Sequence, residues 1–205
     1  MEAVAPATPA TPEPRHGGAA PIVRPPPLAV GTIVWLASEV MFFSGLFAAY
    51  FTLRANSRGP WPPAGVDLDA KVAGLFTLAL VASSGTIQLG VRALVRGDRA
   101  AYRRWLLATA GLALLFLANQ AREWGEATFS ASSHPFGSAF YVMTGFHGLH
   151  VLGGVVAMLF MVGRAMRPRF GARPEDVAAA EVVSYYWHFV DVVWLGMYAT
   201  LFLLK

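Results

Sequence analysis

Residues 185–194 read YYWHFVDVVW, and they place a histidine and an aspartate three positions apart inside an otherwise apolar run. A charged side chain at the centre of a bilayer costs from about 2.5 to more than 10 kcal/mol, so such residues usually face protein and have a role. We therefore expect this stretch to lie in a membrane-spanning helix, with partners for His188 and Asp191 supplied by the rest of the chain.

The composition of the 205-residue chain is that of an integral membrane protein. Hydrophobic residues make up 56% of the sequence and charged residues 14%, with a mean hydropathy of +0.49. This leaves too little polar surface for a soluble globule. The absence of cysteine excludes disulfides, thiolate metal sites, iron–sulfur clusters and cysteine nucleophiles. The net charge of +4 does not indicate nucleic-acid binding, because the basic residues lie in short loops between apolar runs.

Five apolar segments, each long enough to cross about 30 Å of hydrocarbon, account for most of the chain. They cover residues 28–53, 72–95, 105–123, 138–164 and 177–204. Residues 1–27 hold eight of the fourteen prolines, so we predict a disordered cytoplasmic tail there, without a cleavable signal peptide. The predicted fold class is an all-α membrane protein, a bundle of five transmembrane helices with no second domain.

The distribution of basic residues predicts the orientation of the bundle, because positively charged loops stay in the cytoplasm. Lys71, Lys205, Arg54, Arg58 and Arg122 lie on one side. The other side holds eleven arginines: Arg15, Arg24, Arg92, Arg96, Arg99, Arg103, Arg104, Arg164, Arg167, Arg169 and Arg173. We therefore predict a cytoplasmic N-terminus and a C-terminus outside.

Five ionisable residues from three segments are predicted to lie at a similar depth, near the membrane midplane. At about 1.5 Å per residue, Glu39, His150, His188 and Asp191 fall roughly 15 to 20 Å from the cytoplasmic ends of their helices, and His147 a little farther. His147 and His150, like His188 and Asp191, are spaced i,i+3 on one helical face. If the helices touch, these residues form one hydrogen-bonded cluster, within which Asp191 orients the His188 imidazole.

Each member of this cluster has a structural and a chemical interpretation. His188 and Asp191 are interpreted first as a buried pair that locks two helices together. Glu39 is surrounded by apolar residues, which disfavour a charged carboxylate, so proton handling competes with a helix–helix hydrogen bond. Metal or haem ligation by His147, His150 and His188 is disfavoured by the absence of an HExxH motif and of cysteine. We expect no metal in this chain.

Two further polar groups are interpreted as structural or interfacial. Ser83, Ser84, Thr86 and Gln88 crowd one part of the second segment and are expected to hydrogen-bond between helices. The outer end of the third segment carries a second set, for which we expect contacts with lipid headgroups or loops: Gln120, Arg122, Glu123 and Trp124.

The residues alone leave two other classes of function open. A membrane metalloenzyme or di-haem cytochrome would use the three histidines as ligands. A proton-coupled transporter would use Glu39 and Asp191 as a relay, but neither an inverted repeat nor a broken helix pair is evident. No nucleophile with its base and no phosphate-binding glycine loop emerges, so no catalytic residue is assigned.

Four ordered motifs resemble cytochrome c oxidase subunit III. They are WLASEVMFF at 35–43, QAREW at 120–124, TGFHGLHV at 144–151 and YWHFVDVVW at 186–194. The resemblance runs in register from about residue 31 to the C-terminus. The chain is similar to the five-helix bacterial form, which lacks the first two helices of longer members. It departs from the family at Trp124, where a tyrosine is common.

The resemblance implies an accessory subunit of a proton-pumping oxidase that reduces oxygen to water in the bacterial plasma membrane. It implies no cofactor in this chain, with haem and copper in partner subunits, and a bound phospholipid. The implied partners are oxidase subunit I as the main contact, subunit II, other oxidase subunits and membrane lipids. A supercomplex with a cytochrome bc complex stays open. Glu39 matches the intramembrane glutamate that reacts with carbodiimides. A subunit of a quinol oxidase or a nitric-oxide-reductase-associated homologue is the alternative.

Overall fold

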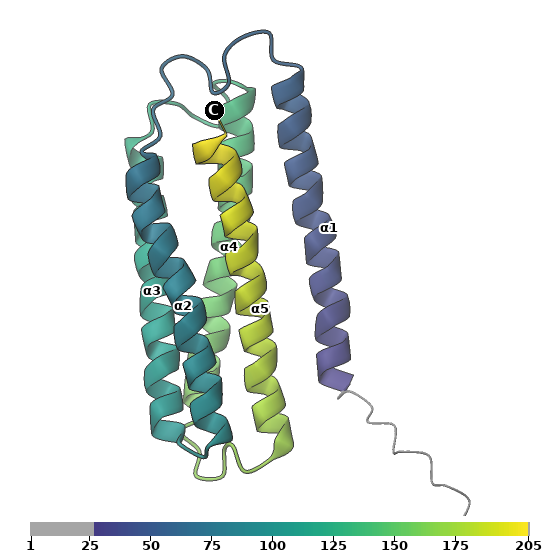
Figure 1. Cartoon of the computed structure of the whole chain (residues 1–205), viewed down its shortest axis with the longest axis vertical. Helices are drawn as coiled ribbons and strands as arrows, with labels where there is room; N and C mark the ends of the chain where they lie inside the picture. The colour runs from purple at the N-terminus through teal and green to yellow at the C-terminus, as the bar shows by residue number, and fades with distance from the viewer. Residues whose placement is uncertain (1–26, 205) are drawn as a thin grey trace, which may run out of the picture.

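The computed structural model describes residues 27–204, and across them the chain forms five long α-helices. These are α1 (Pro27–Ala55), α2 (Ala70–Val95), α3 (Arg99–Glu126), α4 (Pro135–Arg164) and α5 (Pro174–Tyr198), which continues as a π-helical turn, η1 (Ala199–Leu203). The helices run alternately up and down, so the α2–α3 turn and the α4–α5 loop share one end of the bundle (Figure 1). The described residues contain no strand, which agrees with the predicted all-α class.

The first four predicted segments each lie within a helix, and the fifth covers most of α5 and η1. Residues 1–26 of the predicted tail lie outside the described residues. The tail's last residue, Pro27, instead begins α1, since proline is tolerated in a first helical turn. The largest shift is in α3, which begins six residues before the predicted segment. Its polar first turns follow Asp98, whose carboxylate accepts the Ala101 N–H at 2.8 Å.

Of the helices in residues 27–204, four are long and apolar enough to cross a membrane, one fewer than predicted. These are α1 to α4. The remaining helix, α5, is of similar length and runs between the same two ends of the bundle (Figure 1). Its hydropathy is lowered by acidic residues, two in its first turn and Glu181 and Asp191 farther along. Helix α5 therefore falls below the hydropathy of a membrane span, although it packs beside helices that reach it.

The core lies between α2, α3, α4 and α5, where large buried side chains pack against small residues. Trp187 of α5 is fully buried against Gly154 of α4. A Cβ at Gly154 would meet the Trp187 ring at 2.6 Å, so only glycine permits this close approach. The indole N–H of Trp187 donates to Ser83 Oγ at 2.8 Å, and that of Trp194 donates to Thr77 Oγ1 at 2.9 Å. These bonds bring α2 and α5 together, as the polar residues of the second segment predict.

The first helix stands to one side of the other four (Figure 1). It packs mainly against α4 and α5. Apolar residues such as Ile33 and Met41 point away from the chain, with 62% and 76% of their surface exposed. Near the other end of α1, the Tyr50 hydroxyl donates to the Thr200 carbonyl at 3.0 Å. Helix α1 is therefore attached along one edge and presents apolar surface on the others.

Candidate functional site

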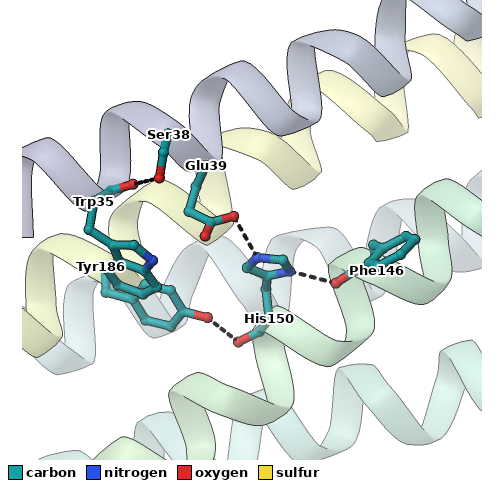
Figure 2. A network of polar contacts seen from close by, with 6 residues as sticks. All are labelled: Trp35, Ser38, Glu39, Phe146, His150 and Tyr186. Carbon is teal, nitrogen blue, oxygen red and sulfur yellow. Dashed lines mark hydrogen bonds and ion pairs between the residues drawn. The ribbon is translucent and has the colours of Figure 1, made fainter.

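Glu39 of α1 and His150 of α4 form a polar pair between the outlying helix and the bundle. Oε2 of Glu39 lies 3.1 Å from Nε2 of His150. The two side chains retain only 20% and 16% exposure. Figure 2 shows the carboxyl group directed from α1 at the imidazole. The pair therefore ties α1 to α4 with ionisable groups that are largely removed from the surface.

The geometry of this pair requires one proton between its two side chains. Nδ1 of His150 lies 2.7 Å from the carbonyl oxygen of Phe146, which can only accept, so Nδ1 carries a hydrogen. A hydrogen bond between Nε2 and the Glu39 carboxyl group then needs a second proton, held on either side. The pair is thus imidazolium with carboxylate, or neutral imidazole with carboxylic acid. In both states one proton lies between Nε2 and Oε2.

Aromatic side chains surround the pair. The Tyr186 hydroxyl donates to the His150 carbonyl at 2.8 Å, and the Trp35 ring stacks on Tyr186 with centroids 5.2 Å apart (Figure 2). The Phe43 ring meets the His150 ring edge-on at 4.9 Å. These apolar faces lower the local dielectric constant and strengthen the interaction of the pair. Sequence reasoning did not single out Trp35 or Tyr186, since their roles depend on the neighbouring helices.

His188 and Asp191 meet at a third residue, Ser84 of α2. The Ser84 Oγ lies 2.9 Å from His188 Nδ1, and the Ser84 hydroxyl donates to Asp191 Oδ2. Ser184 approaches the other imidazole nitrogen, Nε2, at 3.3 Å. The expected orientation of His188 directly by Asp191 is thus replaced by a hydroxyl bridge from another helix. We call Ser84, His188 and Asp191 the serine bridge; it joins α2 to α5.

His147 belongs to neither polar group. It is fully buried, and its ring stacks on Trp194 at 5.0 Å and meets Phe116 edge-on at 5.8 Å. Neither ring nitrogen has a hydrogen-bond partner among the described residues. The i,i+3 spacing turns the two α4 histidines about 60° apart around the helix axis. His150 therefore faces α1, whereas His147 faces the core.

The single hydrogen-bonded cluster expected from helix depth is consequently divided into three parts. Glu39 bonds His150, Ser84 bridges the α5 residues, and His147 packs as an aromatic ring. Similar depth is not sufficient for contact, because side chains at one depth can point in different directions around their helix axes. Within residues 27–204, no group of three or more histidine, cysteine, aspartate or glutamate side chains is placed to hold one metal ion.

The residues predicted for lipid or loop contact at the end of α3 have separate environments. Gln120 is buried and donates through Nε2 to the Thr144 carbonyl at 2.6 Å. The indole N–H of Trp124 donates to Thr144 Oγ1 at 3.2 Å, and its ring lines an apolar groove of about 500 Å³ between α3 and α4. Gln120 and Trp124 thus join α3 to α4 through hydrogen bonds. Lipid contact at Trp124, whose ring lines the groove, stays a prediction.

The two charged residues of this set lie nearer the loops. Arg122 pairs with Glu126 on the surface and donates to the Asn119 side chain at 2.9 Å. Glu123 lines a small cleft that it shares with Asp69, at the start of α2. These positions place both side chains beside the α1–α2 connection, so contact with loops and contact with headgroups both stay predictions.

Comparisons with known proteins agree on one family. The family model for cytochrome c oxidase subunit III matches residues 14–205. A probable cytochrome c oxidase subunit 3 from Nocardia farcinica is 48% identical over 186 residues, covering 89% of this chain and 90% of that protein. The subunit 3 of Corynebacterium diphtheriae is 44% identical over 187 residues, with the same coverage of 89% and 90%. That of Thermostichus vulcanus is 39% identical and covers 85% of this chain and 86% of the relative.

Proposed function

Because the chain belongs to the cytochrome c oxidase subunit III family, we propose that it stabilises the catalytic subunit I and supports proton uptake while oxygen is reduced to water. In this proposal the chain has no active site of its own, and haem and copper are held by partner subunits. The names of its relatives favour an oxidase of cytochrome c over the quinol oxidase and nitric oxide reductase alternatives.

The observation that carries the proton role is the direct contact between the Glu39 carboxyl group and the His150 imidazole. The Phe146 carbonyl fixes the hydrogen on Nδ1, so the 3.1 Å contact between Nε2 and Oε2 holds one further proton. A pair that can place its proton on either group is suited to accept and release it. Both side chains keep some exposure, so neither group is fully enclosed by this chain.

The apolar outer surface supports the proposed subunit role. Helix α1 exposes large aliphatic and aromatic side chains along its length, as the outward faces of α2 and α4 also do. Such continuous apolar surface is typical of helices that contact lipid or other transmembrane helices. We propose that this surface contacts membrane lipid and subunit I in the bacterial plasma membrane.

The proposed orientation places the basic end of the bundle in the cytoplasm, with α5 as the fifth membrane span. Since the chain has no cysteine, Ala172→Cys in the α4–α5 loop and Ser132→Cys in the α3–α4 loop can be compared directly. Both native residues are exposed. We expect a membrane-impermeant maleimide added to intact spheroplasts to label the Ser132 variant only. Labelling of the Ala172 variant alone would reverse the orientation.

The proton role is tested with Glu39→Gln in the intact oxidase. The amide keeps a side chain of similar size and can donate to Nε2, but it cannot take up the shared proton. We expect a several-fold loss in the number of turnovers before inactivation and slower proton uptake, with carbodiimide labelling abolished. The haem spectrum should not change, because no haem ligand is altered.

Asp191→Asn is the matched control, because it neutralises another intramembrane carboxyl group that belongs to the serine bridge. If both variants keep normal proton uptake and sustained turnover, the proton role of Glu39 is wrong. A stoichiometric haem or copper in the purified chain would contradict the absence of a cofactor. These two results are independent of each other.

A further inference from the structure

The α4–α5 loop, residues 165–173, forms a basic cleft of about 270 Å³ with the ends of the two helices that it joins. The loop lies at the same end of the bundle as the α2–α3 turn (Figure 1). Four arginines and two acidic residues line the cleft: Arg164, Arg167, Arg169, Arg173, Glu175 and Asp176. With four guanidinium groups and two carboxylates, the lining carries a net charge of +2. The cleft contains no residue of the Glu39–His150 pair or of the serine bridge.

A buried ion pair forms the floor of this cleft. Arg164 donates to Asp176 Oδ1 at 2.6 Å, and the Gly171 N–H donates to Oδ2 of the same carboxylate at 3.1 Å. The Asp176 side chain is buried, and the Arg164 guanidinium lies 5.6 Å from the centre of the Phe170 ring. Because these two charged groups already bind each other, they shape the cleft and are not its free binding groups.

The other three arginines of the cleft are exposed. Arg167, Arg169 and Arg173 form none of the ion pairs within residues 27–204. A guanidinium group stays charged at physiological pH, and its parallel N–H donors match a carboxylate or a phosphate. Glu175, which is also exposed, is the one acidic residue of the lining that lies beside them. The cleft therefore presents three positive charges to a partner.

Contacts with α3 hold the loop in one position. Arg99 donates to the Arg167 carbonyl at 3.0 Å. The Phe170 ring is buried and stacks on Tyr102, with ring centroids 5.9 Å apart. Because the backbone that carries the exposed arginines is already fixed, a partner that binds them has little loop ordering to offset.

The composition of the lining favours one kind of occupant. A lipid tail needs accessible apolar side chains, but the one apolar residue of the lining, Phe170, is 6% exposed and packs inward. Three arginines distributed over residues 167–173 offer several separate donor arrays. A polypeptide segment with several carboxylates can occupy all of them, whereas a single small anion has fewer acceptors to offer.

We propose that this cleft docks an acidic segment of a neighbouring oxidase subunit. Carboxylates of that segment accept hydrogen bonds from the guanidinium groups of Arg167, Arg169 and Arg173. Exposed ion pairs contribute little affinity one by one, but complementary charge fixes how two partners are placed against each other. The cleft thus positions one end of the bundle, while apolar helix surfaces supply the rest of the contact. The inference rests on the proposed assembly with other oxidase subunits, but not on the proton role of Glu39.

The test uses the intact oxidase in its native membrane, with a benzophenone maleimide attached to Ala172→Cys. Ala172 is exposed beside Arg173, and the chain has no other cysteine. After irradiation we expect a crosslinked peptide from another oxidase subunit that carries several aspartates or glutamates close together. The yield should fall several-fold as salt is raised, because salt screens exposed charges. Crosslinks confined to lipid, or to segments without acidic residues, would overturn the proposal.

The three exposed arginines are tested together in the same labelled protein. Arg167→Gln/Arg169→Gln/Arg173→Gln should lower the yield of this crosslink several-fold and remove most of its dependence on salt. Inorganic phosphate that abolishes the crosslink, at an ionic strength matched with chloride, would show a small-anion site and contradict the docked segment.

Arg92→Gln/Arg96→Gln/Arg104→Gln is the matched control, since it removes the same charge from exposed residues that do not line the cleft. An equal loss of crosslinking in this control would overturn the proposal. Copurification of the chain with the oxidase, measured in parallel, separates loss of this contact from failure of the proposed assembly. If the variant with the altered cleft does not assemble, the identity and salt dependence of the crosslink in the protein with all its arginines decide alone.

Discussion

The Glu39–His150 pair and the serine bridge use the same residue types, a carboxyl group and an imidazole, to join helices. The difference is in what lies between them. Glu39 contacts its histidine directly, whereas His188 and Asp191 are each hydrogen-bonded to Ser84. The first joins an outlying helix to the bundle, and the second joins two core helices. The same two functional groups thus have different arrangements, depending on whether a third residue is bonded to both.

Trp187→Ala should have the largest effect on stability, because it removes a large, fully buried side chain from the core between α2, α4 and α5. The indole is fully buried against Gly154 and donates to Ser83, so its removal leaves a cavity and takes away the hydrogen bond that Ser83 Oγ accepts. We expect a loss of about 3–5 kcal/mol in stability. Thermal unfolding of the purified chain in detergent measures it. Trp35→Ala, which removes a half-exposed ring on α1, is the control. An equal loss at Trp35 would remove the distinction between core and outlying helix.

Ser84→Ala removes the hydroxyl of the serine bridge and leaves His188 and Asp191 in place. Neither side chain then has its hydrogen-bond partner on α2, which should cost about 1–3 kcal/mol. The measurement is denaturation in a mixed micelle, with sustained turnover of the oxidase as a second readout. Turnover per surviving complex should be normal. A variant as stable as the parent would show that the bridge does not hold the two helices.

Tyr186→Phe should have the smallest effect of the three. It removes the hydroxyl that donates to the His150 carbonyl but keeps the ring that stacks on Trp35. The expected loss is about 0.5–1.5 kcal/mol. Tyr185→Phe is the control, since Tyr185 is the preceding residue and its side chain is exposed. Equal effects in the two variants, measured by the same unfolding assay, would mean that the Tyr186 hydroxyl does not support the site.

The helices themselves could be predicted because their signal is local. An apolar run of about 20 residues is sufficient to indicate a span, and four helices meet that criterion. The predicted third segment begins six residues after α3 does, because Arg103 and Arg104 interrupt the apolar pattern, although Asp98 already provides the cap. Apolar composition reports which part of a helix is buried in lipid, and helix caps report where the helix begins.

The candidate site was predicted only in part. Glu39 and His150 were both identified from the cost of placing ionisable groups in a membrane, which can be read from a single helix. Their pairing could not be read in the same way, because it depends on where α1 lies. His147 shows the limit most clearly. It is a histidine in the same motif, yet it faces an aromatic core and has no polar partner among the described residues.

The sequence alone was sufficient to indicate long apolar helices and the polar residues that they carry, four of these helices being apolar enough to cross a membrane. Only the tertiary structure decided that Glu39 meets His150, that Ser84 separates His188 from Asp191, and that the arginines of the α4–α5 loop line one cleft. The physical reason is that hydropathy and helical rise act along one helix axis. Contacts also depend on the direction of each side chain around that axis and on which helix stands there.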